Sequence, residues 1–143
     1  MGLGQMFLVL LAVVLFSTII LSTQNNLYTL SQTAYHSMIS MQGYKIADRF
    51  FQEIEILNIS GNKTIEQIKS HYSFADSLLR INQINYFVTS TTHWCDQYGN
   101  STADSLHKYL RVDIRINCIL GNDTLYVGSP FAPVSNIFAA IGP

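Results

Sequence analysis

The sequence predicts an α+β protein, in which one long N-terminal helix packs against a small antiparallel β-sheet. Apolar residues recur at helical spacing as far as Leu57, and beyond Ile84 the period changes to two. Charge is also unevenly distributed, because all 8 Lys and Arg and all 9 Asp and Glu residues lie at or beyond Lys45. With a net charge of -1 the chain has no basic field, so we expect no nucleic-acid partner.

The segment 6–21 reads MFLVLLAVVLFSTIIL, and its only polar members are Ser17 and Thr18. With its flanks, a helix of this kind approaches the ~30 Å thickness of the hydrocarbon core of a bilayer. Three interpretations compete: a cleaved secretory signal, a single-pass membrane anchor, and a helix that first resides in a membrane and later packs against copies of itself. A signal sequence has a positive n-region and a shorter apolar core, and this segment has neither.

Residues 27–57 predict an amphipathic continuation of the same helix. The apolar positions at steps of three and four are Leu27, Leu30, Ala34, Met38, Met41, Tyr44, Ala47, Phe51, Ile54 and Leu57. Between residues 5 and 60 there is no proline and only one glycine, Gly43, so nothing ends this helix earlier. We therefore predict a spine helix over residues 1–57, with 1–25 as its transmembrane or filament-core part, and a globular head over 58–143.

The head is predicted to contain one short helix and an antiparallel sheet. Thr64 and Gln67 have the spacing of a capping box, and apolar positions at helical period predict a helix over 64–79. Strands of a three- or four-stranded sheet are predicted over 84–92, 109–120 and 124–127, with 134–141 as an edge strand or covering loop. A sheet with one apolar face needs a cover, and the stripe from Leu30 to Leu57 on the long helix is available.

An uncharged start, an apolar half-helix and an amphipathic half-helix followed by a small β domain together resemble a type IV pilin or pseudopilin. The resemblance covers residues 1–57, and it implies that a prepilin peptidase removes a leader before Met1 and that Met1 is methylated. Gln5 then occupies the position where most members carry a glutamate, so an amide hydrogen bond would set the register between subunits. Ser22 stands where most members carry a proline.

The resemblance implies a structural subunit of an extracellular type IV pilus-like filament, assembled by packing of the apolar helices. Its partners would be copies of itself in a helical homo-oligomer, the inner membrane before assembly, and the pilus assembly machinery. Two alternatives remain open: a pseudopilin or minor pilin of a secretion or uptake system, and a single-pass membrane-anchored binding domain.

No catalytic or cofactor-binding motif stands out along the chain. There is no G-x-S-x-G elbow and no glycine-rich phosphate loop, and the 4 histidines and 2 cysteines lack the spacing of metal ligands. We therefore expect no enzyme, no catalytic residues, no metal and no cofactor.

Cys95 and Cys118 are candidates for a disulfide, since a pilin-like subunit matures outside the cytoplasm, where such a bridge persists. Direct hairpin pairing of strands 84–92 and 109–120 would instead place the two cysteines ~33 Å apart. Either the bridge forms and the strands are not simple hairpin partners, or both thiols are free. We expect the bridge, with 93–107 folded back across the sheet.

Two sequence patterns predict surface glycosylation. The N-x-[ST] pattern occurs at Asn58, Asn62, Asn100 and Asn122. The pattern Asp, then Ser or Thr, then an apolar residue resembles a bacterial O-glycosylation signal, and it occurs at Ser77, Ser105 and Thr124. The alternative is that these Asp and Ser residues mark turns and helix caps.

Overall fold

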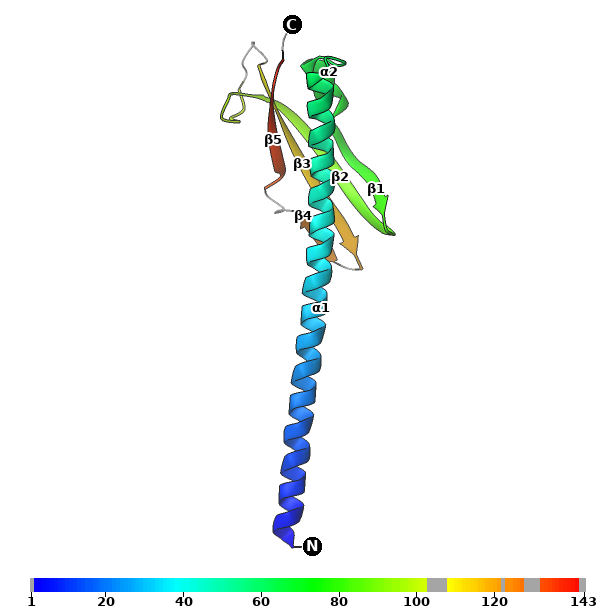
Figure 1. The fold of residues 1–143 in the computed structure, drawn as a ribbon, viewed down its shortest axis with the longest axis vertical. Helices are drawn as coiled ribbons and strands as arrows, with labels where there is room; N and C mark the ends of the chain where they lie inside the picture. The colour runs from blue at the N-terminus through cyan, green and yellow to red at the C-terminus, as the bar shows by residue number, and fades with distance from the viewer. Residues whose placement is uncertain (1, 103–107, 122, 128–131, 142–143) are drawn as a thin grey trace. The chain divides into compact units, whose positions relative to one another are not determined.

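The computed structural model describes residues 2–102, 108–121, 123–127 and 132–141 (Figure 1). Its elements are α1 (Leu3–Ile59), α2 (Ile65–His71), β1 (Phe74–Ile81), β2 (Ile84–Cys95), β3 (Tyr109–Leu120), β4 (Asp123–Val127) and β5 (Val134–Ala139). The predicted fold class is confirmed, because a long N-terminal helix is combined with a small antiparallel sheet.

The chain divides into two compact units, Met1–Met38 and Ile39–Pro143. The first unit is the N-terminal part of α1, and the second contains the rest of α1 together with α2 and all five strands. Our predicted boundary at residue 57 followed the end of the helix, whereas the residues that pack together begin at Ile39.

The sheet is built around β3, which has neighbours along both edges. β2 pairs with one edge from Tyr109 to Cys118, and β5 and β4 share the other edge, β5 along 109–114 and β4 along 116–120. β1 pairs with β2 and forms an outer strand, so the sheet has five antiparallel strands, more than the three or four that we predicted.

The helix predicted over 64–79 is wrong beyond residue 71. Its start is confirmed, because Thr64 and Gln67 form a capping box in which each side chain accepts from the backbone N–H of the other. Residues 74–81 instead form β1, which pairs with β2 across a tight turn. Asn82 and Gln83 in that turn have φ values of 50° and 67°, as in a type I′ hairpin. Pairing with β2 therefore overrides a helical spacing that was too short to be decisive.

The core of the second unit lies between α1 and one face of the sheet (Figure 1). The alternating residues of β3 predicted to share a face are all buried: Leu110, Val112, Ile114, Ile116 and Cys118. From the helix the buried apolar residues are Ile39, Ile46, Ala47, Phe51 and Ile54. At Gly43 the helix backbone lies so close to β4 that an added Cβ atom would clash with a methyl carbon of Val127.

The predicted covering stripe from Leu30 to Leu57 is only partly correct. Within the second unit, Met41 and Tyr44 are 60% and 48% exposed, although their spacing placed them on the stripe. The helix buries Ile46 and Gly43 instead, because a residue without a side chain lets the backbone approach β4 at this point. The sheet therefore packs against the row of helix residues that includes Gly43 and Ile46, next to the row that includes Met41 and Tyr44.

Candidate assembly surface

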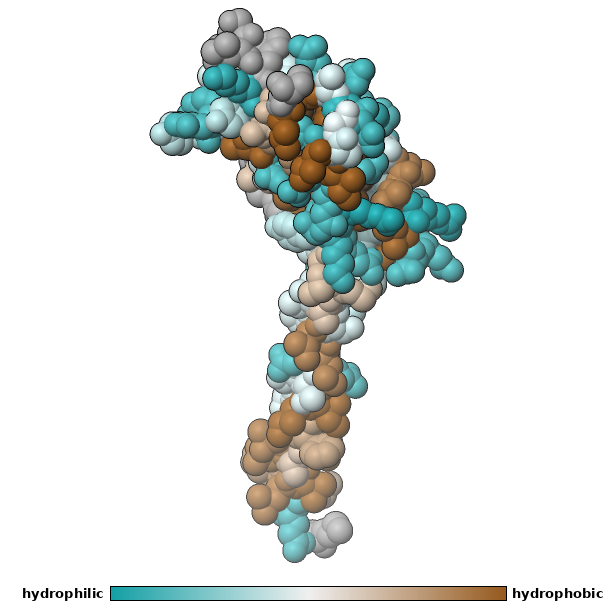
Figure 2. Space-filling view, turned by 45° about the horizontal axis from the view of Figure 1, so that its top comes forward, coloured by the Kyte–Doolittle hydropathy of each residue, from teal (hydrophilic) through white to brown (hydrophobic). Residues whose placement is uncertain are grey.

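The candidate functional site is the apolar surface of α1 in the first unit. Every residue from Leu3 to Met38 is exposed, and the large apolar side chains of the first 21 residues are between 43% and 91% exposed. Apolar surface dominates this segment, whereas hydrophilic residues cover much of the visible surface of the second unit (Figure 2). Within the described residues, α1 is the one helix long and apolar enough to cross a membrane.

Length and composition alone would also suit a signal sequence or the core helix of a soluble protein. In the most apolar stretch of α1, no residue is buried inside this chain, so this part of α1 is not a core helix of the chain. An apolar surface of this extent needs a cover from outside the chain, either lipid or protein.

Three hydroxyl groups in or next to the apolar segment bond to the backbone of α1 itself. Ser17 Oγ donates to the carbonyl oxygen of Val13, and Thr18 Oγ1 donates to that of Leu15, both at 2.8 Å. Thr23 Oγ1 makes a similar bond to the preceding turn. Because each donor has an internal partner, these hydroxyls add little cost when the helix enters an apolar environment.

Gln5 differs from these hydroxyl residues. Its backbone N–H donates to the carbonyl oxygen of Gly2 at 2.8 Å, but its side-chain amide makes no hydrogen bond to the described part of the chain. It is the one polar side chain along a shallow groove of the helix lined by Met6, Leu8, Val9, Leu10 and Val13. When other apolar side chains cover this groove and exclude water, an unpartnered amide there would cost roughly 2–7 kcal/mol, so burial of the groove would require a partner for Gln5 from another molecule. Met1, the predicted methylation site, lies outside the described residues.

The structure contradicts the predicted disulfide. Cys95 pairs with Tyr109 across the β2–β3 ladder, whereas Cys118 pairs with Tyr86 near its opposite end. The cysteines are therefore about nine residues apart along the ladder, or ~30 Å, and a disulfide requires Cα atoms within ~7 Å. Both cysteines are buried free thiols, and burial raises the pKa of each.

The course of the chain after residue 92 explains the error. We expected 93–107 to fold back across the sheet, but β2 stays in register with β3 as far as Cys95. β2 and β3 form the direct hairpin, and this arrangement separates the thiols.

Two of the four Asn-linked candidates use their side-chain amides within the fold. Asn58 Nδ2 donates to the carbonyl oxygen of Ala139 at 2.8 Å, which joins the end of α1 to the end of β5. Asn100 Nδ2 donates to Asp96 Oδ2 at 3.1 Å. Asn62 is exposed in the turn after α1, and Asn122 lies outside the described residues. Glycosylation at these positions stays a prediction.

Of the O-linked candidates, Ser77 on β1 and Thr124 on β4 are exposed, and Ser105 lies outside the described residues. The Asp that precedes Ser77 has a structural role of its own. Asp76 has a positive φ of 48° at a bulge of β1, and Thr89 Oγ1 donates to its carboxylate while accepting from its backbone N–H. At this triplet Asp76 stabilises a strand bulge, which is neither a turn nor a helix cap, and modification stays a prediction.

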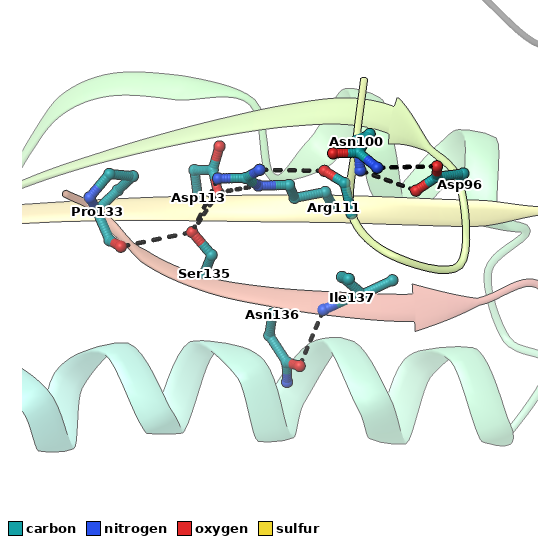
Figure 3. A network of polar contacts seen from close by, with 9 residues as sticks. Asp96, Asn100, Arg111, Asp113, Pro133, Ser135, Asn136 and Ile137 are labelled. Atoms are coloured by element: carbon teal, nitrogen blue, oxygen red, sulfur yellow. Dashed lines mark hydrogen bonds and ion pairs between the residues drawn. The ribbon is translucent and has the colours of Figure 1, made fainter. Parts of the chain in front are cut away.

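A polar network on the outer face of the sheet was not expected from the sequence (Figure 3). Arg111 Nε donates to Asp113 Oδ1 at 2.8 Å, and its Nη1 donates to the carbonyl oxygen of Gly99 at 3.1 Å. Ser135 Oγ on β5 donates to the same carboxylate oxygen at 2.5 Å. In the sequence, this network is indicated only by the alternation of opposite charges along β3. That alternation does not predict the contacts of Arg111 and Asp113 with the loop or with β5.

The loop that contacts Arg111 is closed by Asp96. Its carboxylate accepts the backbone N–H groups of Tyr98 at 2.9 Å and Asn100 at 2.8 Å. Hydrogen bonds from Asn100 lower the pKa of Asp96. This network ties the loop, β3 and β5 together through hydrogen bonds among its own donors and acceptors.

No three His, Cys, Asp or Glu side chains gather closely enough to hold a metal ion in the part of the chain that the structure describes. No family model matches this chain, and no curated protein or solved structure matches it either.

Proposed function

We propose that this protein is a structural subunit of an extracellular type IV pilus-like filament, in which the apolar N-terminal helices of many copies pack together. The observation that carries the proposal is that every residue of the apolar segment from Leu3 to Leu21 is exposed in the single chain. Contact among copies would cover this surface, and no charge on the segment would oppose it.

A membrane anchor alone would account for only part of the exposed apolar surface. About 20 residues suffice to cross a bilayer, yet the segment from Ser22 to Met38 also has no Asp, Glu, Lys or Arg. It exposes Leu27, Tyr28, Leu30, Tyr35 and Met38, each by 46% or more. A stalk in water would be expected to carry charged side chains. Packing against other helices explains why apolar and neutral residues continue past the length of a membrane span.

In this proposal the helix resides in the inner membrane first and enters the filament with the help of an assembly machinery. Removal of a leader and methylation of the new N-terminus would act at Met1. Gln5 would bond to a neighbour and set the register, and packing of residues 8–21 would supply most of the cohesion. The role is structural rather than enzymatic. A pseudopilin or minor pilin would use the same contacts in a shorter filament.

The test compares one type of substitution at two exposed β-branched residues of α1. Val13 and Ile56 are 59% and 65% exposed in the single chain, but only Val13 lies in the apolar segment. Val13→Asp should abolish filaments, because packing would bury an unpaired charge. Ile56→Asp, the matched control, should leave filaments largely intact. Filament yield is read by electron microscopy, with the membrane level of the subunit measured in parallel.

If cells with Val13→Asp make normal filaments, packing of the apolar helices is not the basis of assembly. If the unsubstituted protein stays in the membrane and never forms filaments, the single-pass anchored binding domain becomes the better description.

A further inference from the structure

The second unit contains an apolar groove between α1 and the inner face of β1. Its floor is formed by Ile46 and Phe50 from the helix and by Leu79 and Ile81 from the strand, and its volume is about 500 Å³. The groove exists because β1 is the outer strand and α1 leaves its inner face partly uncovered, so that Leu79 remains 38% exposed. This volume falls within the range of roughly 300–1,000 Å³ typical of small-molecule sites.

Contacts beneath the groove hold its walls in place. The Phe50 ring packs against Phe74 with centroids 5.9 Å apart, and Ile46 is only 6% exposed. Gln42, at one end of the groove, accepts a hydrogen bond from the hydroxyl of the fully buried Tyr86 at 2.7 Å. The floor is therefore formed before any ligand arrives.

Two cations, Lys45 and Arg49, line the same groove. They are four residues apart on α1 and so lie on one side of the helix, one turn apart. Neither has an acidic partner within the described ranges, and two like charges at this spacing repel weakly. An anion placed between them would relieve this repulsion and gain two charge-assisted contacts.

Two acidic residues, Asp48 and Glu53, lie nearby on α1. Gln52 Nε2 donates to the carboxylate of Asp48 at 2.8 Å. Glu53, which also lines the groove, lies beside the hydroxyl of Tyr72; burial raises the pKa of that phenol, and the Glu53 carboxylate raises it further. The anionic end of a ligand is therefore expected next to Lys45 and Arg49, away from Glu53.

We propose that this groove binds a free fatty acid in its carboxylate form. Its carboxylate lies between Lys45 and Arg49, and its single acyl chain lies along the apolar floor. The charge of the two cations complements an anion, and one strip of four apolar side chains suits one acyl chain rather than the two of a phospholipid. This site is separate from the apolar segment of the first unit and does not depend on filament assembly.

The test uses the full chain in phosphatidylcholine nanodiscs and a photoreactive dodecanoate, with labelled positions mapped on peptic peptides. We expect labelling of peptides that contain Phe50 or Leu79. The double variant Lys45→Gln, Arg49→Gln should reduce it at least fivefold. The matched control, Lys63→Gln with Arg115→Gln, removes two other cations and should leave labelling unchanged. A photoreactive dodecanol, which has the same chain without the charge, should label the groove at least fivefold less.

Labelling of residues 3–21 serves as an internal reference, because both probes partition into the bilayer beside the apolar helix. Equal labelling of the groove by dodecanoate and dodecanol would overturn the proposal, as would equal labelling in the double variant and the control. Labelling confined to residues 3–21 would also overturn it. The thermal unfolding of each variant is measured to show that the second unit remains folded.

Discussion

The two parts of α1 differ in what covers them, although both belong to one helix. From Leu3 to Met38 every residue is exposed and none is Asp, Glu, Lys or Arg, whereas from Ile39 onward the helix buries a row of residues against the sheet. Charges return at Lys45, on surface that the sheet does not cover. The comparison shows that a segment can form a helix whether or not the rest of its own chain buries it. One part is covered by its own chain, and the other needs a cover from outside it.

The largest difference between the two parts of α1 should be seen when an aspartate is introduced into each part and the stability of the second unit is measured. Ile54 is fully buried, so Ile54→Asp would place a carboxylate in the core and destabilise the second unit by about 3–5 kcal/mol. Val13→Asp should leave the unfolding of that unit unchanged. Near-UV circular dichroism during thermal unfolding of the full chain in a neutral detergent measures both. Similar unfolding temperatures for the two variants would contradict the division into units.

A second comparison uses the glycines of the same helix. Gly43→Ala would place a methyl group against Val127 and should destabilise the second unit by about 1–3 kcal/mol. Gly4 has no atom within 4 Å of an added Cβ, so Gly4→Ala should strengthen the helix by up to about 1 kcal/mol without changing the second unit. Denaturant unfolding of the second unit gives both values. A stabilising effect of Gly43→Ala would show that α1 does not approach β4 closely.

A smaller effect is expected at Gln5. Gln5→Leu removes one amide contact but keeps the apolar surface, so filament yield should fall by about two- to tenfold, which corresponds to one neutral hydrogen bond of about 0.5–1.5 kcal/mol. Electron microscopy of sheared filaments gives the yield. Complete loss of filaments would mean that the amide, and not the packing of residues 8–21, supplies most of the cohesion.

The smallest effect is expected from reducing agents. Because Cys95 and Cys118 are separate free thiols, reductant should not change the unfolding temperature. Maleimide should label both fully in denaturant without reductant. In the folded protein labelling should be slow at pH 8, since burial raises both pKa values and lowers the thiolate fraction, and it should speed up as the pH rises. If neither cysteine reacted with maleimide in denaturant without reductant, the two would be joined by the disulfide that the sequence predicted.

Local patterns in the sequence correctly predicted the helices and strands whose periodicity continues over many residues. The absence of helix breakers predicted α1 to within two residues at each end, and the strict alternation over 109–120 predicted β3 and the face that it buries. The capping box predicted the start of α2. Each of these follows from neighbours along the chain, because helical and strand periods are properties of the backbone.

The tertiary structure alone decided which elements meet and in which register. Residues 74–81 form a strand because β2 is available to pair with them, and Gly43 rather than Met41 faces the sheet because β4 approaches there. The ladder of β2 and β3 likewise holds Cys95 and Cys118 apart. Such choices depend on contacts between residues distant in sequence, for which periodicity carries no information. The apolar segment is apparent in the sequence, but its full exposure in the single chain became visible only in the fold.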